Sequence, residues 1–209
     1  MQSLSFAKSG LTEKEWRIIT KLSTPKKIQD YLDKLPFNFE KGGQTHYSVR
    51  ETLKEKKAHC FEGALLACTA LWAQGQKPMI LDLVSARPDF DHMVALFKVG
   101  GLWGGISKTN HAVLRYREPV YRDVRELAMS YFHEYFLFDG TKTMRAFSEP
   151  FDLRVFGTEW LTSKDNLAWI AHEIDISPHT KILSPKQVRN LRKADKIERD
   201  ASKIVQYKK

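Results

Sequence analysis

The stretch that decides the fold of this chain is AHCFEGALLACTALWAQ, residues 58–74. Its apolar residues recur at helical spacings and Gly75 follows where helices commonly end, which predicts a buried helix over residues 60–74. Cys60 then lies in the first turn, where unpaired backbone N–H groups and the helix dipole stabilise a thiolate. Cys60 is therefore a candidate nucleophile, although free cysteines are more often small buried hydrophobes. Cys68, in mid-helix among apolar neighbours, is expected to be inert.

Three strands are predicted directly after this helix, over residues 78–84, 92–99 and 102–107. The dipeptide Gly100-Gly101 is a two-residue hairpin signal between the second and the third strand. A turn at these glycines pairs residues whose numbers sum to 201, so Thr109 lies opposite His92 and Ser107 is its diagonal neighbour. The centre of the chain is thus predicted as helix, strand, strand, strand.

Helices are predicted on both sides of this centre. Short helices in the first fifty residues are indicated by the capping-box pairs Thr12 with Glu15 and Ser48 with Glu51 and by the dipeptide Thr24-Pro25. The later segments are predicted as a helix over 122–136, an extended segment over 144–156, a helix over 165–173 and a basic amphipathic helix packed on the body over 184–204. This organisation predicts one compact domain with three parts, namely an N-terminal helical segment 1–47, a core 48–160 and a C-terminal helical extension with a basic tail 161–209.

The composition favours a single protein domain that folds without disulfides. With 209 residues, of which 42% are hydrophobic, the chain can fill a sizeable core. Cys60 and Cys68 are eight positions apart on one predicted helix, about 12 Å along its axis, too far for a disulfide. Two free thiols are expected in a reducing compartment. No apolar leader and no run of eighteen apolar residues occurs, so we expect a cytoplasmic protein without a membrane span.

The formal net charge of +9 is concentrated at the C-terminus. From Lys181 to Lys209 the chain has ten basic residues and three acidic ones. Such a tail could contact nucleic acid, an anionic membrane or an acidic partner, but it is more often a solvated helix face. Nucleic-acid binding is not favoured, because no recognised module and no stripe of basic and aromatic residues accompanies the tail.

His92 is the histidine best placed to act with Cys60. It opens a predicted strand after a charged turn, so its ring could face the start of the helix and act as the base toward the thiol. A zinc site formed by His59, Cys60, His92 and His111 is not expected, because no CxxC or HExxH spacing supports it. The glycines of the hairpin open no helix and form no phosphate loop, so no cofactor is predicted.

The segments 58–60, 91–94 and 101–107 together resemble the transglutaminase-like branch of the papain-like cysteine enzymes. The shared pattern is a helix led by Cys, a strand led by His and a strand containing Trp, and it covers roughly residues 48–110. The resemblance implies an α+β fold in which the Cys-bearing helix packs on an antiparallel sheet. It also implies that Cys60 is the nucleophile and His92 the general base and acid of a hydrolase or acyltransferase. The implied substrates are a peptide, a protein or a small amide.

The third member of the family's site is the point of departure. The position of the usual Asp falls on Ser107, whose hydroxyl can orient an imidazole but cannot stabilise imidazolium as a carboxylate does. Asn110 is the second candidate, and Asp82 and Asp91 are carboxylates that could fill the role from elsewhere. Ser107 thus leaves a second hypothesis, in which a catalytically weak relative binds a partner through the cleft or the basic tail.

An acyl-transfer site also needs N–H donors for the oxyanion. The natural donor is the backbone N–H of Cys60 at the start of the helix. A side-chain donor could come from Gln44, Thr45, His46 or His59, and spacing singles out none of them.

Overall fold

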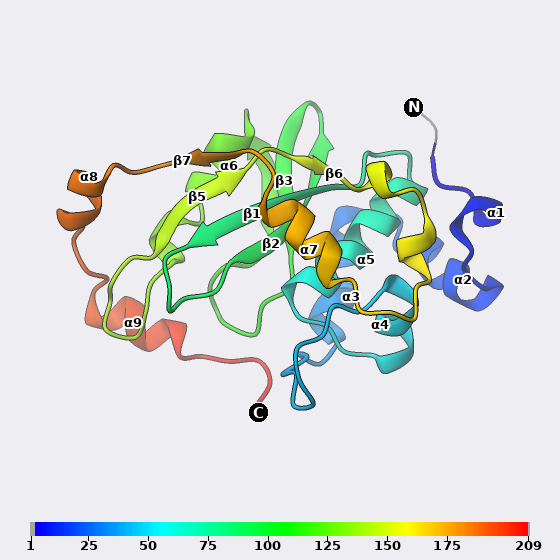
Figure 1. The fold of residues 1–209 in the computed structure, drawn as a ribbon, viewed down its shortest axis with the longest axis horizontal. Coiled ribbons are helices and arrows are strands. Elements are labelled where there is room, and N and C mark those ends of the chain that lie inside the picture. The colour runs from blue at the N-terminus through cyan, green and yellow to red at the C-terminus, as the bar shows by residue number, and fades with distance from the viewer. Residues whose placement is uncertain (1–2, 209) are drawn as a thin grey trace.

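A seven-stranded antiparallel sheet forms the centre of the computed structural model, which describes residues 3–208 (Figure 1). The strands are β1 (Met79–Ser85), β2 (His92–Val99), β3 (Leu102–Ser107), β4 (Arg117–Tyr121), β5 (Met144–Ser148), β6 (Phe151–Asp152) and β7 (His179–Lys181). Their order is β4-β3-β2-β1-β5-β7, and β6 also pairs with β1. All the pairings are antiparallel. The predicted α+β class with an antiparallel sheet is confirmed.

Nine α-helices and three short 3₁₀-helices are present in the described residues. The α-helices are α1 (Phe6–Ser9), α2 (Glu13–Lys21), α3 (Pro25–Lys34), α4 (Val49–Glu55), α5 (Cys60–Ala73), α6 (Val124–Met129), α7 (Ala168–Asp175), α8 (Pro185–Arg189) and α9 (Lys196–Ser202). The 3₁₀-helices are η1 (Phe132–Glu134), η2 (Leu153–Phe156) and η3 (Glu159–Leu161). Helices α1 to α4 gather around α5 at one end of the sheet (Figure 1).

The helix starts predicted in the first fifty residues agree with the structure except in one detail. Thr12 and Glu15 form the complete capping box of α2, in which each side chain accepts the backbone N–H of the other residue. At α4 the Ser48 hydroxyl accepts the N–H of Glu51, but the reciprocal bond of a capping box is not among the contacts of the described residues.

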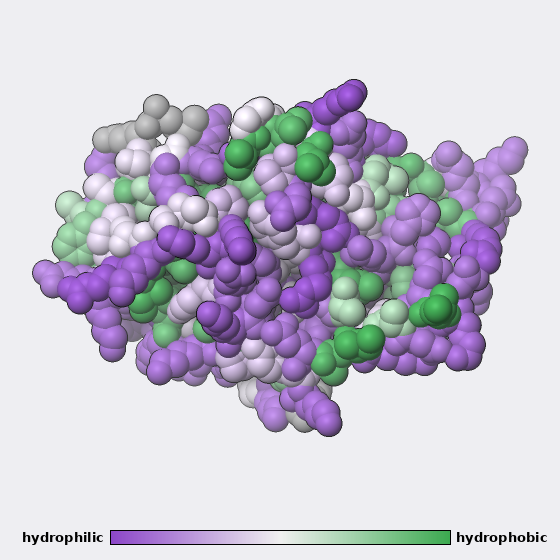
Figure 2. Space-filling view, turned by 180° about the vertical axis from the view of Figure 1, so that it is seen from behind, coloured by the Kyte–Doolittle hydropathy of each residue, from purple (hydrophilic) through white to green (hydrophobic). Residues whose placement is uncertain are grey.

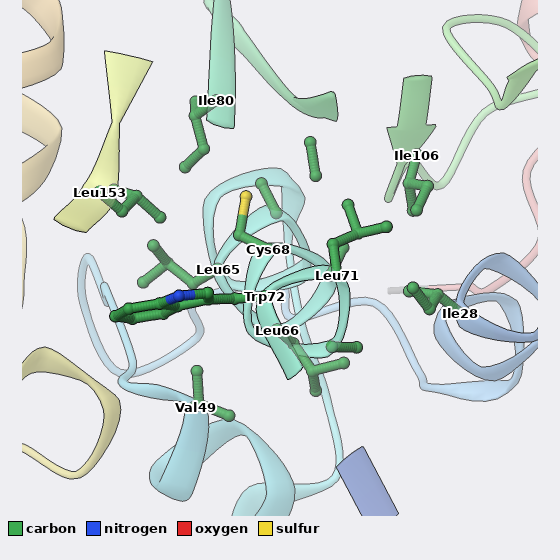
Figure 3. Close-up of a cluster of buried hydrophobic side chains, with 14 of the residues drawn as sticks. Ile28, Val49, Leu65, Leu66, Cys68, Leu71, Trp72, Ile80, Ile106 and Leu153 are labelled. Atoms are coloured by element: carbon green, nitrogen blue, oxygen red, sulfur yellow. The ribbon is translucent and has the colours of Figure 1, made fainter. Parts of the chain in front are cut away.

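Helix α5 is the centre of the main hydrophobic core. Every residue from Phe61 to Trp72 is buried, because the sheet covers one side of the helix and other helices cover the rest. Figure 3 shows the side chains that surround it, including Ile28 of α3, Val49 of α4, Ile80 of β1, Ile106 of β3 and Leu153 of η2. A helix that is apolar all round is expected to be enclosed in this way.

Strand alternation divides the apolar side chains between two cores. Ile80, Ala95 and Ile106 belong to the core around α5, whereas Leu81 and Val94 belong to a second core with α6 and η1. Because neighbouring residues of a strand point to opposite faces, this division shows that helices cover both faces of the sheet.

The β2–β3 hairpin has the predicted register. Val99 pairs with Leu102 and Val94 pairs with Ser107, so the paired numbers sum to 201. Gly100 and Gly101 form the turn with φ angles of 58° and 84°, which glycine adopts without steric cost. The hairpin therefore carries Ser107 to a position diagonal to the start of β2.

Two helix predictions have the wrong bounds. The helix predicted over 122–136 ends at Met129 and is followed by η1. The Arg117 guanidinium donates hydrogen bonds to the carbonyl and the hydroxyl of Ser130. The Ser130 hydroxyl in turn donates to the Leu127 carbonyl. These side-chain hydrogen bonds use the carbonyls of Leu127 and Ser130 at the end of α6, where the helix stops. The helix predicted over 165–173 is α7, displaced by a few residues.

The single amphipathic helix predicted over 184–204 is also wrong. The chain forms α8 and α9 instead, because a new capping box between Asp195 and Glu198 starts a second helix. Ala194 is buried and Leu191 packs against the second core, but Ile197 and Ile204 are 79% and 64% exposed, so only the first part of the apolar stripe packs on the body. The C-terminal part is not purely helical either, since it contributes β7 to the sheet.

The segment 144–156, predicted as extended, is β5, β6 and then η2.

No helix within the described part of the chain is both long enough and apolar enough to cross a membrane.

Gly63 lets α5 approach the chain beyond β3. A Cβ atom on Gly63 would lie 2.5 Å from the Cβ of Lys108. Lys108 cannot move away, since it is buried and its Nζ donates to the carbonyls of Leu32 and Leu35. Gly63→Ala is therefore expected to lower the free energy of unfolding by about 1–3 kcal/mol, despite the better helix propensity of alanine. Urea denaturation checks this value.

The control is Gly42→Ala, at a site with open space around the added methyl. This variant is expected to change the free energy of unfolding by less than about 0.5 kcal/mol. Equal stabilities of the two variants would contradict the close packing at Gly63.

Candidate active site

The two cysteines lie in different environments on α5. Cys60 is the first residue of the helix and is half-buried, whereas Cys68 is fully buried in mid-helix. Burial raises the pKa of the Cys68 thiol well above its usual value. Burial also opposes ionisation of Cys60, but hydrogen bonds from His59 and His92 outweigh it and hold the pKa of Cys60 well below its usual value. Of the two cysteines, Cys60 is therefore the one whose surroundings favour the thiolate.

His92, the first residue of β2, is oriented by Ser107, the last residue of β3. The His92 Nε2 and the Ser107 Oγ are 2.7 Å apart, and the hydroxyl donates its proton to the Leu114 carbonyl at 2.5 Å. Ser107 must therefore accept from His92, which assigns the imidazole proton to Nε2 and leaves Nδ1 as an acceptor. The structure thus brings Cys60, His92 and Ser107 together, each at the end of its element.

The alternative third members are engaged elsewhere. The Asn110 side chain exchanges two hydrogen bonds of 2.9 Å with the backbone of Tyr207. Asp91 accepts from the backbone N–H and hydroxyl of Ser85. Asp82 lies 3.3 Å from the Nε2 of His179. Among the hydrogen bonds of residues 3–208, none joins these three side chains to His92.

The backbone N–H of Cys60 is available for an oxyanion. It has no hydrogen-bond partner within residues 3–208, as expected for the first residue of a helix. The next N–H, that of Phe61, is bonded to the Nδ1 of His59 at 3.3 Å. A carbonyl held beside the Cys60 sulfur would therefore meet a free donor at the helix start.

Glu62 is a site residue that the sequence analysis did not predict. Its carboxylate is fully buried and accepts hydrogen bonds from four groups: the Asn38 amide, the Thr45 hydroxyl and the backbone N–H groups of Tyr47 and His59. The pattern that could have indicated it is the spacing of His59 and Glu62, which form a capping box at the start of α5.

His59 lies between this carboxylate and the thiol. Its Nε2 is 2.8 Å from the Thr45 carbonyl, 3.5 Å from Glu62 Oε1 and 3.7 Å from Glu40 Oε1. Burial lowers the pKa of His59, but the hydrogen bond and charge of the Cys60 thiolate and the charge of Glu62 raise it to about 9. His59 and Cys60 thus stabilise each other's charged forms.

The basic tail is partly neutralised by acids of its own and by Asp139. Ion pairs join Arg192 to Asp195, Lys196 and Lys203 to Asp200, and Lys193 to Asp139. Figure 2 shows hydrophilic residues over most of the face that it presents, with separate hydrophobic patches between them. The tail is therefore a solvated surface on which part of the positive charge is paired.

Metal ligation has no support among the described residues, where no group of three or more His, Cys, Asp or Glu side chains could hold an ion. Of the four residues considered for zinc, His111 is exposed and its Nδ1 contacts the Ser202 carbonyl.

Neither a protein-family model nor a curated protein matches this chain. The chemistry of the site therefore rests on its own residues.

The contrast between the two thiols predicts selective alkylation. In the native protein, iodoacetamide is expected to label Cys60 at pH values well below about 8.5, the usual cysteine pKa, because the thiolate is the reactive form. Cys68 is expected to stay unlabelled until the protein unfolds. Site-resolved mass spectrometry measures both rates, and equal labelling of the two cysteines would contradict the assignment.

The raised pKa of the buried Asp82 predicts that the stability of the protein depends on pH. Burial and the nearby Asp91 raise the pKa of Asp82 from 3.8 to about 7, although His179 opposes them. Between these pH values the folded protein retains a proton that the unfolded chain has released, so this group makes the free energy of unfolding fall as the pH rises. Asp82→Asn is expected to flatten that fall.

Chemical denaturation at a series of pH values measures this effect. The control is Asp165→Asn at an exposed aspartate, which is expected to leave the pH profile of the wild type unchanged. An equally steep fall in Asp82→Asn would show that Asp82 is ionised in the folded protein.

Proposed function

We propose that this protein is a cysteine-dependent acyl-transfer enzyme with Cys60 as nucleophile, His92 as general base and acid, and Ser107 as the residue that orients His92. The observation that carries the proposal is the 2.7 Å hydrogen bond from His92 to Ser107, which leaves Nδ1 as the acceptor beside a thiol of lowered pKa. The resemblance to the transglutaminase-like branch of the papain-like enzymes supports the same roles.

The reaction follows from these positions. The Cys60 proton passes to His92 Nδ1, and the thiolate attacks the carbonyl carbon of an amide while the Cys60 N–H stabilises the oxyanion. The C–N bond then breaks, and the leaving nitrogen takes the proton from His92. Next, water or an amine attacks the thioester, His92 accepts the proton of this nucleophile, and the sulfur leaves as thiolate. Water makes the enzyme a hydrolase and an amine makes it an acyltransferase.

The proposed substrates are a peptide, a protein or a small amide. An activated ester reports the chemistry without knowledge of the natural acyl donor. With p-nitrophenyl acetate, the wild type is expected to release p-nitrophenol and to acquire an acetyl group on Cys60. His92→Ala is expected to form this thioester more slowly than the wild type, because it lacks the general base. Cys60→Ser tests the nucleophile, and Cys68→Ala is the matched thiol control.

Mass spectrometry of the quenched reaction locates the acetyl group. Acetylation at Cys60 that depends on His92 supports the proposal, and added primary amines then distinguish transfer from hydrolysis. An unmodified Cys60 in the folded wild type would overturn it. The alternative, a protein that binds a partner without catalysis, would then take precedence. Ser107 in the place of an acid favours this alternative.

Ser107 is expected to make a smaller contribution than His92. Ser107→Ala removes one hydrogen bond to His92, worth about 1 to 1.5 kcal/mol, so acylation is expected to slow about tenfold. Ser107→Thr keeps the hydroxyl and is the conservative control. Wild-type acylation rates and pH profile in Ser107→Ala would show that the hydroxyl does not orient the imidazole.

A further inference from the structure

None of Cys60, His92 and Ser107 carries a carboxylate. A buried carboxylate, that of Glu62, instead lies beside a different imidazole, that of His59, the residue before Cys60. Ser107 is neutral and cannot stabilise a cationic His92. Glu62 has no exposed surface, and its four donor groups stabilise a full negative charge at the helix start. A charge buried in this way favours a nearby cation.

His59 is the group placed to carry that cation. Its side chain is only 13% exposed, and its Nε2 faces the Thr45 carbonyl and the two carboxylates of Glu40 and Glu62. These oxygens accept hydrogen bonds, so Nε2 carries a proton. Nδ1 faces the start of α5, where its contact with the Phe61 N–H is long at 3.3 Å. A second proton on Nδ1 therefore displaces only a weak hydrogen bond.

We propose that Glu62 holds His59 as an imidazolium whose Nδ1–H donates to the Cys60 thiolate, which makes His59 a second catalytic imidazole and Glu62 its positioning residue. This inference deepens the proposed function and rests on it. His59 takes its proton from solvent, so the Cys60 proton still passes to His92. Two ion pairs result, one between Glu62 and His59 and one between Cys60 and His92, and their charges sum to zero.

The consequence is a thiolate that does not depend on His92 alone. When His92 gives its proton to the leaving nitrogen, His59 remains beside the sulfur and keeps it a good leaving group for the second step. The titratable groups that face His59 are Cys60, Glu40, Glu62 and His46, whose ring centroid is 6.0 Å away. The Cys60 thiolate also faces His92 and the buried Tyr135.

The first test uses the wild-type protein. Nitrogen and carbon NMR shifts of His59 are expected to report a doubly protonated ring at neutral pH that titrates near pH 9. In Cys60→Ala the titration is expected to move to lower pH, because the thiolate that stabilises the cation is absent. A neutral His59 ring at neutral pH in the wild type would overturn the proposal.

The second test compares variants by the pH dependence of Cys60 alkylation. His59→Asn offers a side-chain acceptor to the Phe61 N–H, so the start of the helix has a cap while the imidazolium charge is lost. It is expected to alkylate at least about tenfold more slowly than the wild type at mildly acidic pH, whereas His92→Ala retains part of the fast labelling. An unchanged profile in His59→Asn, with all fast labelling lost in His92→Ala, would show that His59 is only a cap.

A matched pair of charge removals tests the role of the buried carboxylate. Glu62→Gln and Glu40→Gln remove charges at similar distances from His59, but the Glu40 side chain is 35% exposed and is screened by water. Glu62→Gln is expected to slow alkylation in the same direction as His59→Asn, and Glu40→Gln to change it less than about twofold. Equal effects of the two variants on the alkylation rate would show that any nearby negative charge acts in this way and that Glu62 has no specific role.

Failure of this proposal and failure of the proposed function are distinguishable, because alkylation and NMR need no acyl substrate. An acetylated Cys60 with a neutral His59 would retain the acyl-transfer site and remove the second imidazole. A cationic His59 beside an unacylated Cys60 would retain the ion pair and remove the acyl-transfer chemistry.

Discussion

The buried carboxylate of Glu62 is the constraint on which the rest of the site depends. A charge without solvent contact must be matched by donors and a cation, or it destabilises the fold by several kcal/mol. Asn38, Thr45 and Tyr47 supply donors from the loop before α4, and His59 supplies one from the helix cap. The same interactions therefore attach the loop to α5, define the first turn of that helix and place Cys60 at its start.

The sheet supplies the other half of the site through the ends of its strands. His92 begins β2 and Ser107 ends β3, so the hairpin register decides whether they meet. The buried α5 packs on β2 and brings Cys60 to the same end of the sheet. The groups of the proposed site are thus positioned by rigid elements, and in our proposal the helix cap provides the charge that the hydroxyl of Ser107 lacks.

Local patterns explain which predictions agree with the structure. The apolar run of α5 and the two glycines of the hairpin specify their conformations within a few residues, so these elements and their register were predictable. The structure of residues 184–204 was not predictable in this way, because an apolar stripe packs only if the fold offers a surface that covers it. Ile197 remains exposed, and the cap at Asp195 starts α9 anew. Glu62 was missed because a helix-starting glutamate is usually solvated.

By itself, the sequence determined the class of the fold, the hairpin that places Ser107 diagonal to His92 and the start of a buried helix at Cys60. These features follow from side-chain spacing and turn chemistry, which act over a few neighbouring residues. Only the tertiary structure decided that Asn110 bonds to the distant Tyr207 and that Glu62 is buried behind His59. Burial and partners far along the chain set the charge of a group, and neither is encoded by local spacing.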